Sequence, residues 1–266
     1  MSDKTPETEA ERIARLNAQT ADASTISEEE FKTRSRRSAI VGGAAALAGL
    51  LGWRWLADQR EVQNIPALLR ANHRTTESIW RTLYNPDALA PTFPASRSAM
   101  PRANGRHGLE PELDPETWSL AILDGSGAEI DRVDLEDVRA LEKVELVTEL
   151  KCIEGWSQIV HWGGARFSDF AARYPQAAEV EYVGLATPDG EYRVGMDAAS
   201  MMHPQTLLCY EMQGEPLLPA HGAPLRLMTP LKYGIKQIKR IGTIQFTDAR
   251  PDDYWAERGY DWYSGH

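Results

Sequence analysis

The sequence predicts an α+β domain with a mixed, mostly antiparallel β-sheet, preceded by an apolar N-terminal helix. Apolar segments of strand length recur between turn signals such as Asp124-Gly125 and Asp189-Gly190. Short helical patterns fall between some of them, without the regular strand–helix alternation that gives a parallel sheet. The chain has 266 residues, of which 42% are hydrophobic, so it can bury a substantial core.

Composition excludes several classes of function. Acidic residues outnumber Lys and Arg by 39 to 29, and the net charge of -10 argues against a nucleic-acid partner, because phosphate backbones require a basic surface. Only Cys152 and Cys209 are present, so the chain cannot build a disulfide framework or a four-thiolate zinc or iron–sulfur site. The sequence contains neither a Cys-x-x-Cys-His haem attachment nor a glycine-rich phosphate loop.

The N-terminal region has the layout of an export signal. Residues 1–37 are polar and charged, which is typical of disordered segments. Arg36 and Arg37 precede an apolar, Gly- and Ala-rich stretch at 38–57, as in twin-arginine signals. No small-residue cleavage site follows, and Trp53 and Trp55 suit a membrane interface, so an uncleaved anchor is favoured over a removed signal. The alternative is a short buried helix after a chance arginine pair.

Residues 58–107 are expected to form a helical and extended linker. Apolar residues at helical spacing from Val62 to Leu83 predict a helix or a helix pair. From Tyr84 to Arg106 the chain is rich in Pro, Ala, Ser and Asn, which is typical of an extended segment lying over a domain.

The domain itself is expected to span 108–248, followed by an aromatic tail at 249–266. The predicted strands are 118–122, 144–153, 180–187, 206–212, 225–228 and 235–246. The predicted helices are 135–141, 168–174 with Ser168 as the N-cap, and 198–202.

One of the two cysteines lies where a predicted strand ends. Alternation with a period of two from Val144 onward places Cys152 on the apolar, inward face, and Gly155 with Trp156 then breaks the pattern, as in a turn that lines a cavity. A thiolate there suits a soft transition metal. An ordinary core cysteine and a disulfide with Cys209 are the alternatives at this point. Cys209 itself lies within an apolar strand and is expected to be inert.

A second region forms a cationic strip. It runs from Pro216 to Thr247 without an acidic residue, and it contains Arg226, Lys232, Lys236, Lys239 and Arg240. A solvated strand face is one explanation. Glycines at 222 and 234 permit close backbone approach, so a phosphate-bearing ligand is the other.

Three ordered motifs carry a family resemblance. They are Cys152-Ile153-Glu154-Gly155-Trp156-Ser157, Met202-His203-Pro204-Gln205-Thr206-Leu207, and His221-Gly222-Ala223-Pro224-Leu225-Arg226 followed by Lys232 to Lys239. Together they resemble the molybdopterin-binding domain of the sulfite oxidase family over about residues 104–248, in particular its branch of periplasmic protein-methionine-sulfoxide reductase catalytic subunits.

The resemblance implies a molybdenum–molybdopterin cofactor, with Cys152 as the protein ligand to the metal. The cofactor-binding residues implied by the resemblance and by the cationic strip are Asn104, His107, Thr187, His221, Arg226, Lys236, Gln237, Ile238 and Lys239. His221 stands where the reductase branch has an amide side chain. Glu154 and Tyr233 adjoin the motifs and are expected to hydrogen-bond at the catalytic site.

The implied activity is oxygen-atom transfer on a small or protein-bound sulfoxide, with electrons exchanged with a separate cytochrome, either a membrane b-type or a soluble one. A protein loaded with its cofactor in the cytoplasm must be exported folded, which a twin-arginine route permits, so a periplasmic or extracytoplasmic location is expected.

Three alternatives remain from the sequence. Sulfite oxidation is one, although Glu154-Gly155-Trp156 replaces the basic run that follows the cysteine in sulfite oxidases. The second is a metal-free, membrane-tethered binding module with a Cys152–Cys209 disulfide. The third is a redox protein that uses the Cys152 thiol directly.

Overall fold

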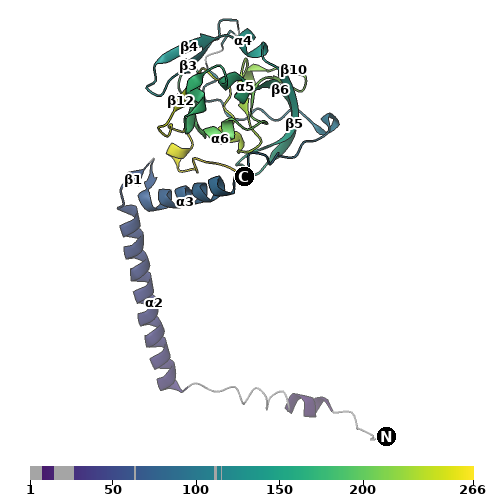
Figure 1. The fold of residues 1–266 in the computed structure, drawn as a ribbon. Coiled ribbons are helices and arrows are strands. Elements are labelled where there is room, and N and C mark those ends of the chain that lie inside the picture. Colours follow the sequence, from purple (N-terminus) through teal and green to yellow (C-terminus); the bar gives the residue numbers. More distant parts are fainter. Residues whose placement is uncertain (1–7, 15–26, 63, 111–112, 115) are drawn as a thin grey trace. The chain divides into compact units, whose positions relative to one another are not determined.

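The computed structural model describes residues 8–14, 27–62, 64–110, 113–114 and 116–266. These fall into two compact units, Met1–Gln59 and Arg60–His266 (Figure 1). The first unit contains the helix α2 (Glu28–Ala57). It begins ten residues before the predicted apolar stretch at 38, because Ser27 accepts a hydrogen bond from the Glu30 amide at 3.2 Å and caps the helix. Residues 28–37 thus form the N-terminal part of this helix, while much of 1–27 lies outside the described residues.

Helix α2 is long and apolar enough to cross a membrane by length and composition, a test that a signal sequence also passes. None of its 30 residues, all of which the structure describes, is buried. The predicted apolar N-terminal helix is thus present.

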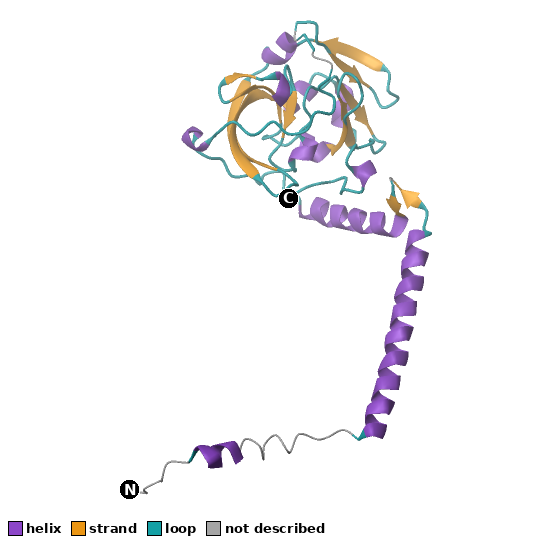
Figure 2. Ribbon diagram, turned by 180° about the vertical axis from the view of Figure 1, so that it is seen from behind, coloured by secondary structure: helices purple, strands orange, loops and turns teal. Residues whose placement is uncertain are grey.

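The second unit contains two five-stranded sheets (Figure 2). One has the order β10-β9-β6-β5, with β11 also paired to β9; its strands are β5 (Lys143–Lys151), β6 (Ser157–Arg166), β9 (Leu207–Met212), β10 (Glu215–Pro216) and β11 (Arg226–Met228). The other has the order β4-β3-β12-β7-β8; its strands are β3 (Leu120–Leu123), β4 (Glu129–Val133), β7 (Tyr182–Ala186), β8 (Arg193–Asp197) and β12 (Thr243–Thr247). All pairs are antiparallel except β12 with β3. The predicted α+β class with a mostly antiparallel sheet is confirmed.

Short helices connect these strands. They are α4 (Leu135–Arg139), α5 (Phe167–Ala171), α6 (Ala198–Met201) and the 3-10 turns η1 (Ala95–Arg97), η2 (Pro175–Ala178), η3 (Pro219–His221), η4 (Gly234–Lys236) and η5 (Ala256–Arg258). The main core contains residues of both sheets and of α5, including Ile122, Phe167, Leu208 and Phe246. A second cluster, which includes Leu150, Trp162 and Cys209, lies beside the sheet that carries Cys152. Both sheets are thereby held rigid around the loops that follow them.

The N-terminal part of this unit is a hairpin, a helix and an extended segment. The hairpin pairs β1 (Glu61–Val62) with β2 (Ile65–Pro66), and α3 (Ala67–Leu83) follows. The segment at 84–107 then lies on the body: the Phe93 amide donates to Val147 O at 2.9 Å, and the Ala99 amide donates to Ile159 O at 3.0 Å. These bonds place residues 101–107 beside the end of β5.

Several local predictions were wrong. Residues 235–246 do not form one strand, because η4 and a turn precede β12. Helix α5 begins at Phe167 with Arg166 at its N-cap position, two residues before the predicted cap, Ser168. Strand β6 was not predicted, because its two central glycines favour a turn in sequence. Gly164 is there because a Cβ atom would lie 2.2 Å from Leu208 O on the neighbouring strand.

Candidate functional site

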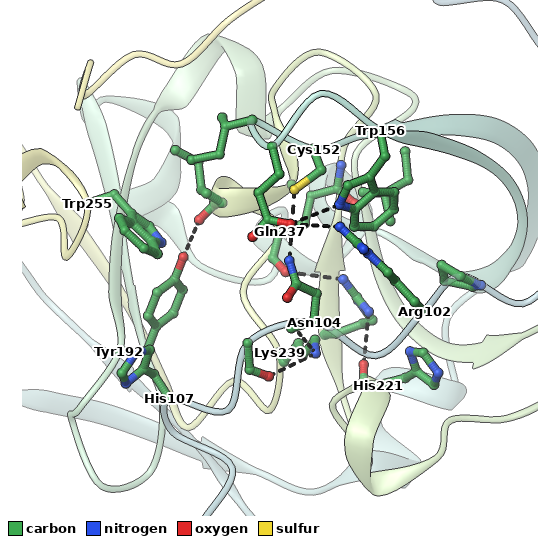
Figure 3. A pocket seen from close by; sticks show the side chains of 18 of the residues that line it. Arg102, Asn104, His107, Cys152, Trp156, Tyr192, His221, Gln237, Lys239 and Trp255 are labelled. Carbon is green, nitrogen blue, oxygen red and sulfur yellow. Dashed lines mark hydrogen bonds and ion pairs between the residues drawn. The ribbon is translucent and has the colours of Figure 1, made fainter.

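A pocket opens at the end of β5, where segments distant in sequence meet (Figure 3). Its lining comes from the extended N-terminal segment, the turn after β5, the loops before and after β11, and the C-terminal region. The lining residues are Pro101, Arg102, Asn104, Gly105, His107, Leu150, Cys152, Ile153, Glu154, Trp156, Tyr192, His221, Arg226, Gly234, Ile235, Gln237, Lys239, Trp255 and Tyr260. The first and third motifs of the sequence line the pocket, whereas no residue of the second motif, Met202–Leu207, is in its lining.

Cys152 is the first residue after β5 and carries a free, partly exposed thiol. The turn that holds it is closed by two backbone hydrogen bonds: the Cys152 amide donates to Trp156 O at 2.9 Å, and the Gly155 amide donates to Cys152 O at 3.1 Å. Gly155 has a φ of 85°, a left-handed conformation that favours glycine. Asn104 Nδ2 lies 4.0 Å from the Cys152 sulfur. The thiol therefore faces the pocket from a fixed turn.

A charged and aromatic cluster borders the thiol. Arg102 donates to Glu154 at 2.8 Å, and its guanidinium stacks 4.6 Å from the centroid of the Trp156 ring (Figure 3). Trp156 Nε1 donates to the same carboxylate at 3.1 Å. Hydrogen bonds from Asn104 and Trp156, together with the charge of Arg102, lower the pKa of Glu154. Arg102 is thus paired with a carboxylate and stacked on an indole ring.

Arg226 forms the deep end of the pocket. It is 4% exposed, and it donates to His221 O at 2.9 Å and to Gln237 O at 3.3 Å. Its Nε and the Gln237 Oε1 find no hydrogen-bond partner among the described residues. Burial of the guanidinium lowers the pKa of Arg226 to about 10. The pKa of His221 is also lowered, by burial of its own ring and by the positive charges of Arg226 and Lys239. A buried cation without a carboxylate partner in the described part of the chain marks a place for an anion.

Lys239 joins the N-terminal segment to this end. Its ammonium donates to Asn104 O at 2.6 Å, to Ala220 O at 2.9 Å and to Gly105 O at 3.3 Å. Burial and the charge of Arg226 lower its pKa to about 8. Gly222 has a φ of 99°, and a Cβ atom there would lie 2.7 Å from that of Lys239, so no larger residue fits. The closeness that this glycine permits brings Lys239 and Arg226 into one pocket.

Aromatic side chains form the opposite wall. Tyr192 donates to Ile235 O at 2.5 Å, and Trp255 and Tyr260 stand edge to face with ring centroids 5.1 Å apart. His107 lies 3.0 Å from the Tyr254 hydroxyl through its Nε2. One side of the pocket is therefore apolar and aromatic, and the other is cationic (Figure 3).

Comparison with known proteins decides what this arrangement is. The family model described as "Oxidoreductase molybdopterin binding domain" matches residues 107–255, which is more than half of the chain. The chain belongs to this family of oxidoreductases. The resemblance to the sulfite oxidase family drawn from the three motifs is confirmed.

Individual relatives of this molybdopterin-binding protein agree. The chain is 32% identical over 86% of its length, and 86% of the relative's, to a putative protein-methionine-sulfoxide reductase subunit YedZ1 from Azospira oryzae. It is 30% identical over 72% of its length, and 62% of the relative's, to the protein-methionine-sulfoxide reductase catalytic subunit MsrP from Xanthomonas campestris pv. campestris. Among solved structures, the sulfane dehydrogenase SoxCD from Paracoccus pantotrophus matches with a TM-score of 0.46 and 17% identity, covering 52% of this chain and 40% of that one.

The pocket fits the cofactor that the family binds. Arg226 and Lys239 supply positive charge for a phosphate, and the unpartnered Gln237 Oε1 supplies an acceptor for a ring N–H. No group of three or more His, Cys, Asp or Glu side chains comes together among the described residues, so Cys152 can hold a metal only with further ligands from a cofactor. This chain is a molybdopterin-dependent oxidoreductase.

Cys152 and seven other predicted site residues line the same pocket. The seven are Asn104, His107, Glu154, His221, Arg226, Gln237 and Lys239. Thr187 is buried just behind it and accepts a hydrogen bond from the Tyr192 amide at 3.1 Å. A Cβ atom on Gly108 would lie 2.3 Å from Thr187, so this threonine supports the N-terminal segment.

Three predicted residues do not reach the pocket with their side chains. Lys236 is 1% exposed, and its ammonium lies 2.6 Å from Asp253 and 2.9 Å from Gly195 O, so its charge is already compensated. Ile238 is buried in the main core. The Tyr233 ring packs on His266 with centroids 4.9 Å apart. Predictions of direct contact by these side chains are not supported, because the loop alternates between facing the core and facing the pocket.

The disulfide alternative is contradicted, because both cysteines carry free thiols. Cys209 pairs with Gly164 on β6, and Gly164 pairs with Val144 at the far end of β5 from Cys152. Burial raises the pKa of Cys209 to about 12, as expected for an inert core thiol.

The pocket side chains that sequence reasoning missed include Arg102, Tyr192, Trp255 and Tyr260. The signal for the last two was the aromatic tail, which had no assigned role. Arg102 and Tyr192 lie in segments without any motif, and only the fold brings them to the site.

Proposed function

We propose that this chain reduces a sulfoxide, small or protein-bound, to the thioether. The observation that carries the proposal is the neutralised arginine beside Cys152. Sulfite is an anion, and its binding next to the metal requires an uncompensated cation. Arg102 is paired with Glu154 at 2.8 Å and stacked on Trp156, so the mouth of the pocket favours a neutral substrate. The relatives named as protein-methionine-sulfoxide reductases support this substrate class.

The reaction takes up two electrons and two protons and releases the thioether and water. Molybdenum, when bound, supplies the oxygen-atom transfer. Cys152 would hold the metal at the end of β5, and its closed turn fixes the direction of the sulfur. Arg226 and Lys239 would hold the anionic end of the cofactor in the same pocket. Glu154, paired with Arg102 and about half exposed, is a carboxylate of the pocket lining to which a proton from solvent can pass.

The aromatic wall suits the apolar part of such a substrate. Trp255 and Tyr260 belong to this wall, and Tyr260 is 42% exposed; Trp156 lines the pocket from the side of Arg102. Aromatic faces bind thioether-type groups favourably through sulfur–aromatic contacts. The exposed position of Tyr260 leaves room for a substrate that is a side chain of another protein.

We further infer that α2 places the enzyme at the outer face of a membrane, where it receives electrons from a separate cytochrome, membrane b-type or soluble. Arg36 and Arg37 before the apolar stretch support export of the folded protein by the twin-arginine route. One relative is named a subunit and another a catalytic subunit, which supports a separate electron partner.

Steady-state kinetics of the metal-loaded protein test this function. With reduced viologen as donor we expect turnover of methionine sulfoxide, and with an artificial acceptor we expect slow sulfite oxidation. Glu154→Gln frees Arg102 and is expected to shift the ratio of the two kcat/KM values toward sulfite by on the order of tenfold. Glu136→Gln removes a comparable surface pair, 2.7 Å from Arg139, and is expected to leave the ratio unchanged. Rapid sulfite oxidation together with inert sulfoxide would contradict the proposal.

A further inference from the structure

Helix α3 is amphipathic, and it turns its charged face toward the body and its apolar face outward. Its two buried residues are the charged Arg70 and Glu77. Arg70 donates to Ala256 O at 2.6 Å and to Tyr260 O at 3.0 Å, and Glu77 pairs with Arg250. Helices on soluble domains ordinarily bury their apolar stripe and expose the charged one.

The apolar side chains of α3 are on the outside. Leu68, Leu69, Ile79, Trp80 and Leu83 are between 42% and 66% exposed. At 3.6 residues per turn these five positions fall within about 120° of one another, and Arg70 and Glu77 lie on the opposite side. They form two groups on one face, Leu68 with Leu69 and Ile79 with Trp80 and Leu83, and Asn72 and Thr76 lie between the groups; we call the five apolar residues the outer stripe of α3. Figure 1 shows α3 lying along the body, and the polar contacts of α3 with the body are made by the face that carries Arg70 and Glu77.

We propose that the outer stripe of α3 lies in the interface of a lipid bilayer. The proposal rests on the membrane attachment inferred for α2 and adds a second contact with the same membrane. Helix α2 ends at Ala57 and α3 begins at Ala67. A chain of that length reaches at most about 36 Å, so an inserted α2 keeps α3 near the bilayer surface.

The composition of the helix agrees with a lipid occupant. Trp80 provides an aromatic side chain of the type enriched at bilayer interfaces. The three arginines of the helix, Arg70, Arg74 and Arg81, lie on the side opposite the five apolar residues, so no charged side chain of α3 would enter the apolar layer. The stripe offers roughly 400–600 Å² of surface from five half-exposed side chains, which is less than the about 800 Å² that each partner brings to a stable protein interface.

The contact has a consequence for the active site. The carbonyl groups that Arg70 binds belong to Ala256 and Tyr260, and Trp255 and Tyr260 line the pocket. Asn64 in the hairpin before α3 donates to Glu257 O at 2.6 Å in the same segment. Seating α3 on the bilayer therefore fixes the aromatic rim of the pocket at a set height above the membrane.

Photocrosslinking of the full chain in its native membranes tests the proposal. Benzoylphenylalanine is placed at Ile79 or Leu83 in the outer stripe, at Ser78 as a matched exposed position outside it, and at Leu47 within α2. We expect lipid adducts, seen as mass shifts of the chain, from Ile79 and Leu83, and on the order of tenfold fewer from Ser78.

The other outcomes overturn the proposal in distinguishable ways. Adducts from Leu47 but none from Ile79 and Leu83 mean that the chain is anchored and the stripe is not in lipid. Absence of adducts from Leu47 as well means that the anchor itself is wrong. Crosslinks from Ile79 to a second copy or to another polypeptide mean that a protein covers the stripe. Activity toward methionine sulfoxide is independent of all three and reports on the proposed function alone.

Discussion

Replacing Arg226 by methionine separates cofactor binding from folding at this site. In the cofactor-free protein the side chain donates two hydrogen bonds to the carbonyl groups of His221 and Gln237 and stacks 5.0 Å from the centroid of Trp162. Two bonds from a charged donor are worth about 3–6 kcal/mol. Against this, burial shifts the Arg226 pKa from 12.5 to about 10, which corresponds to about 3 kcal/mol for keeping the group charged. Methionine restores most of the contact with Trp162 without that cost.

We therefore expect Arg226→Met to lower the free energy of unfolding by no more than about 3 kcal/mol. Its cofactor affinity falls much further, because loss of one charge-assisted contact to a phosphate weakens binding by about 10- to 150-fold. Urea unfolding of the cofactor-free protein gives the first quantity, and molybdenum content after dialysis gives the second.

Arg70→Met is the matched control, since Arg70 is also buried and donates to carbonyl groups but lies outside the pocket lining. It should destabilise the fold and keep its molybdenum. If Arg226→Met retained the metal as well as the wild type does, the assignment of the cationic end of the pocket would be refuted.

Two further predictions concern titration and reactivity. Burial lowers the Lys239 pKa from 10.5 to about 8, so the unfolded chain keeps this proton to a higher pH than the folded chain does. The free energy of unfolding of the cofactor-free protein therefore rises between pH 8 and pH 10.5. Below pH 8 the lysine is protonated in both states, and its effect on the free energy of unfolding is constant. Lys239→Met should reduce that rise in urea titrations at several pH values, leaving the part due to Lys232, whose pKa is also lowered to about 8; an unchanged rise would count against the burial. In native cofactor-free protein, iodoacetamide should alkylate Cys152 and spare Cys209, with mass mapping of tryptic peptides as the readout, and modification of both at equal rates would refute the assigned burial.

The fold class followed from the sequence because strand-length apolar segments and their turns are local signals. Strand β5 illustrates this: alternation from Val144 placed Cys152 at its end, and the strand ends at Lys151. Strand β6 shows the limit, since Gly163 and Gly164 read as a turn and are explained only by the close approach of β9. Local propensity cannot report an interstrand distance.

The sequence predicted the site residues that belong to a motif. It missed the residues that only the fold brings to the pocket. Arg226 and Lys239 are assigned to the pocket by the motif, and both line it. Lys236 belongs to the same cationic strip, but its ammonium forms an ion pair with Asp253, 17 residues away. A count of basic residues in a segment does not show which of them form ion pairs. The sequence therefore predicted more cations available to a ligand than the structure has in this strip.

The proposed function depends on ligation of molybdenum by the Cys152 sulfur. X-ray absorption at the molybdenum edge, on wild type and on Cys152→Ala purified from a host that makes the cofactor, tests this ligation most directly. We expect the variant to retain some molybdenum through Arg226 and Lys239 but to show one sulfur neighbour fewer, with turnover abolished. An unchanged number of sulfur neighbours in the variant would contradict the ligation.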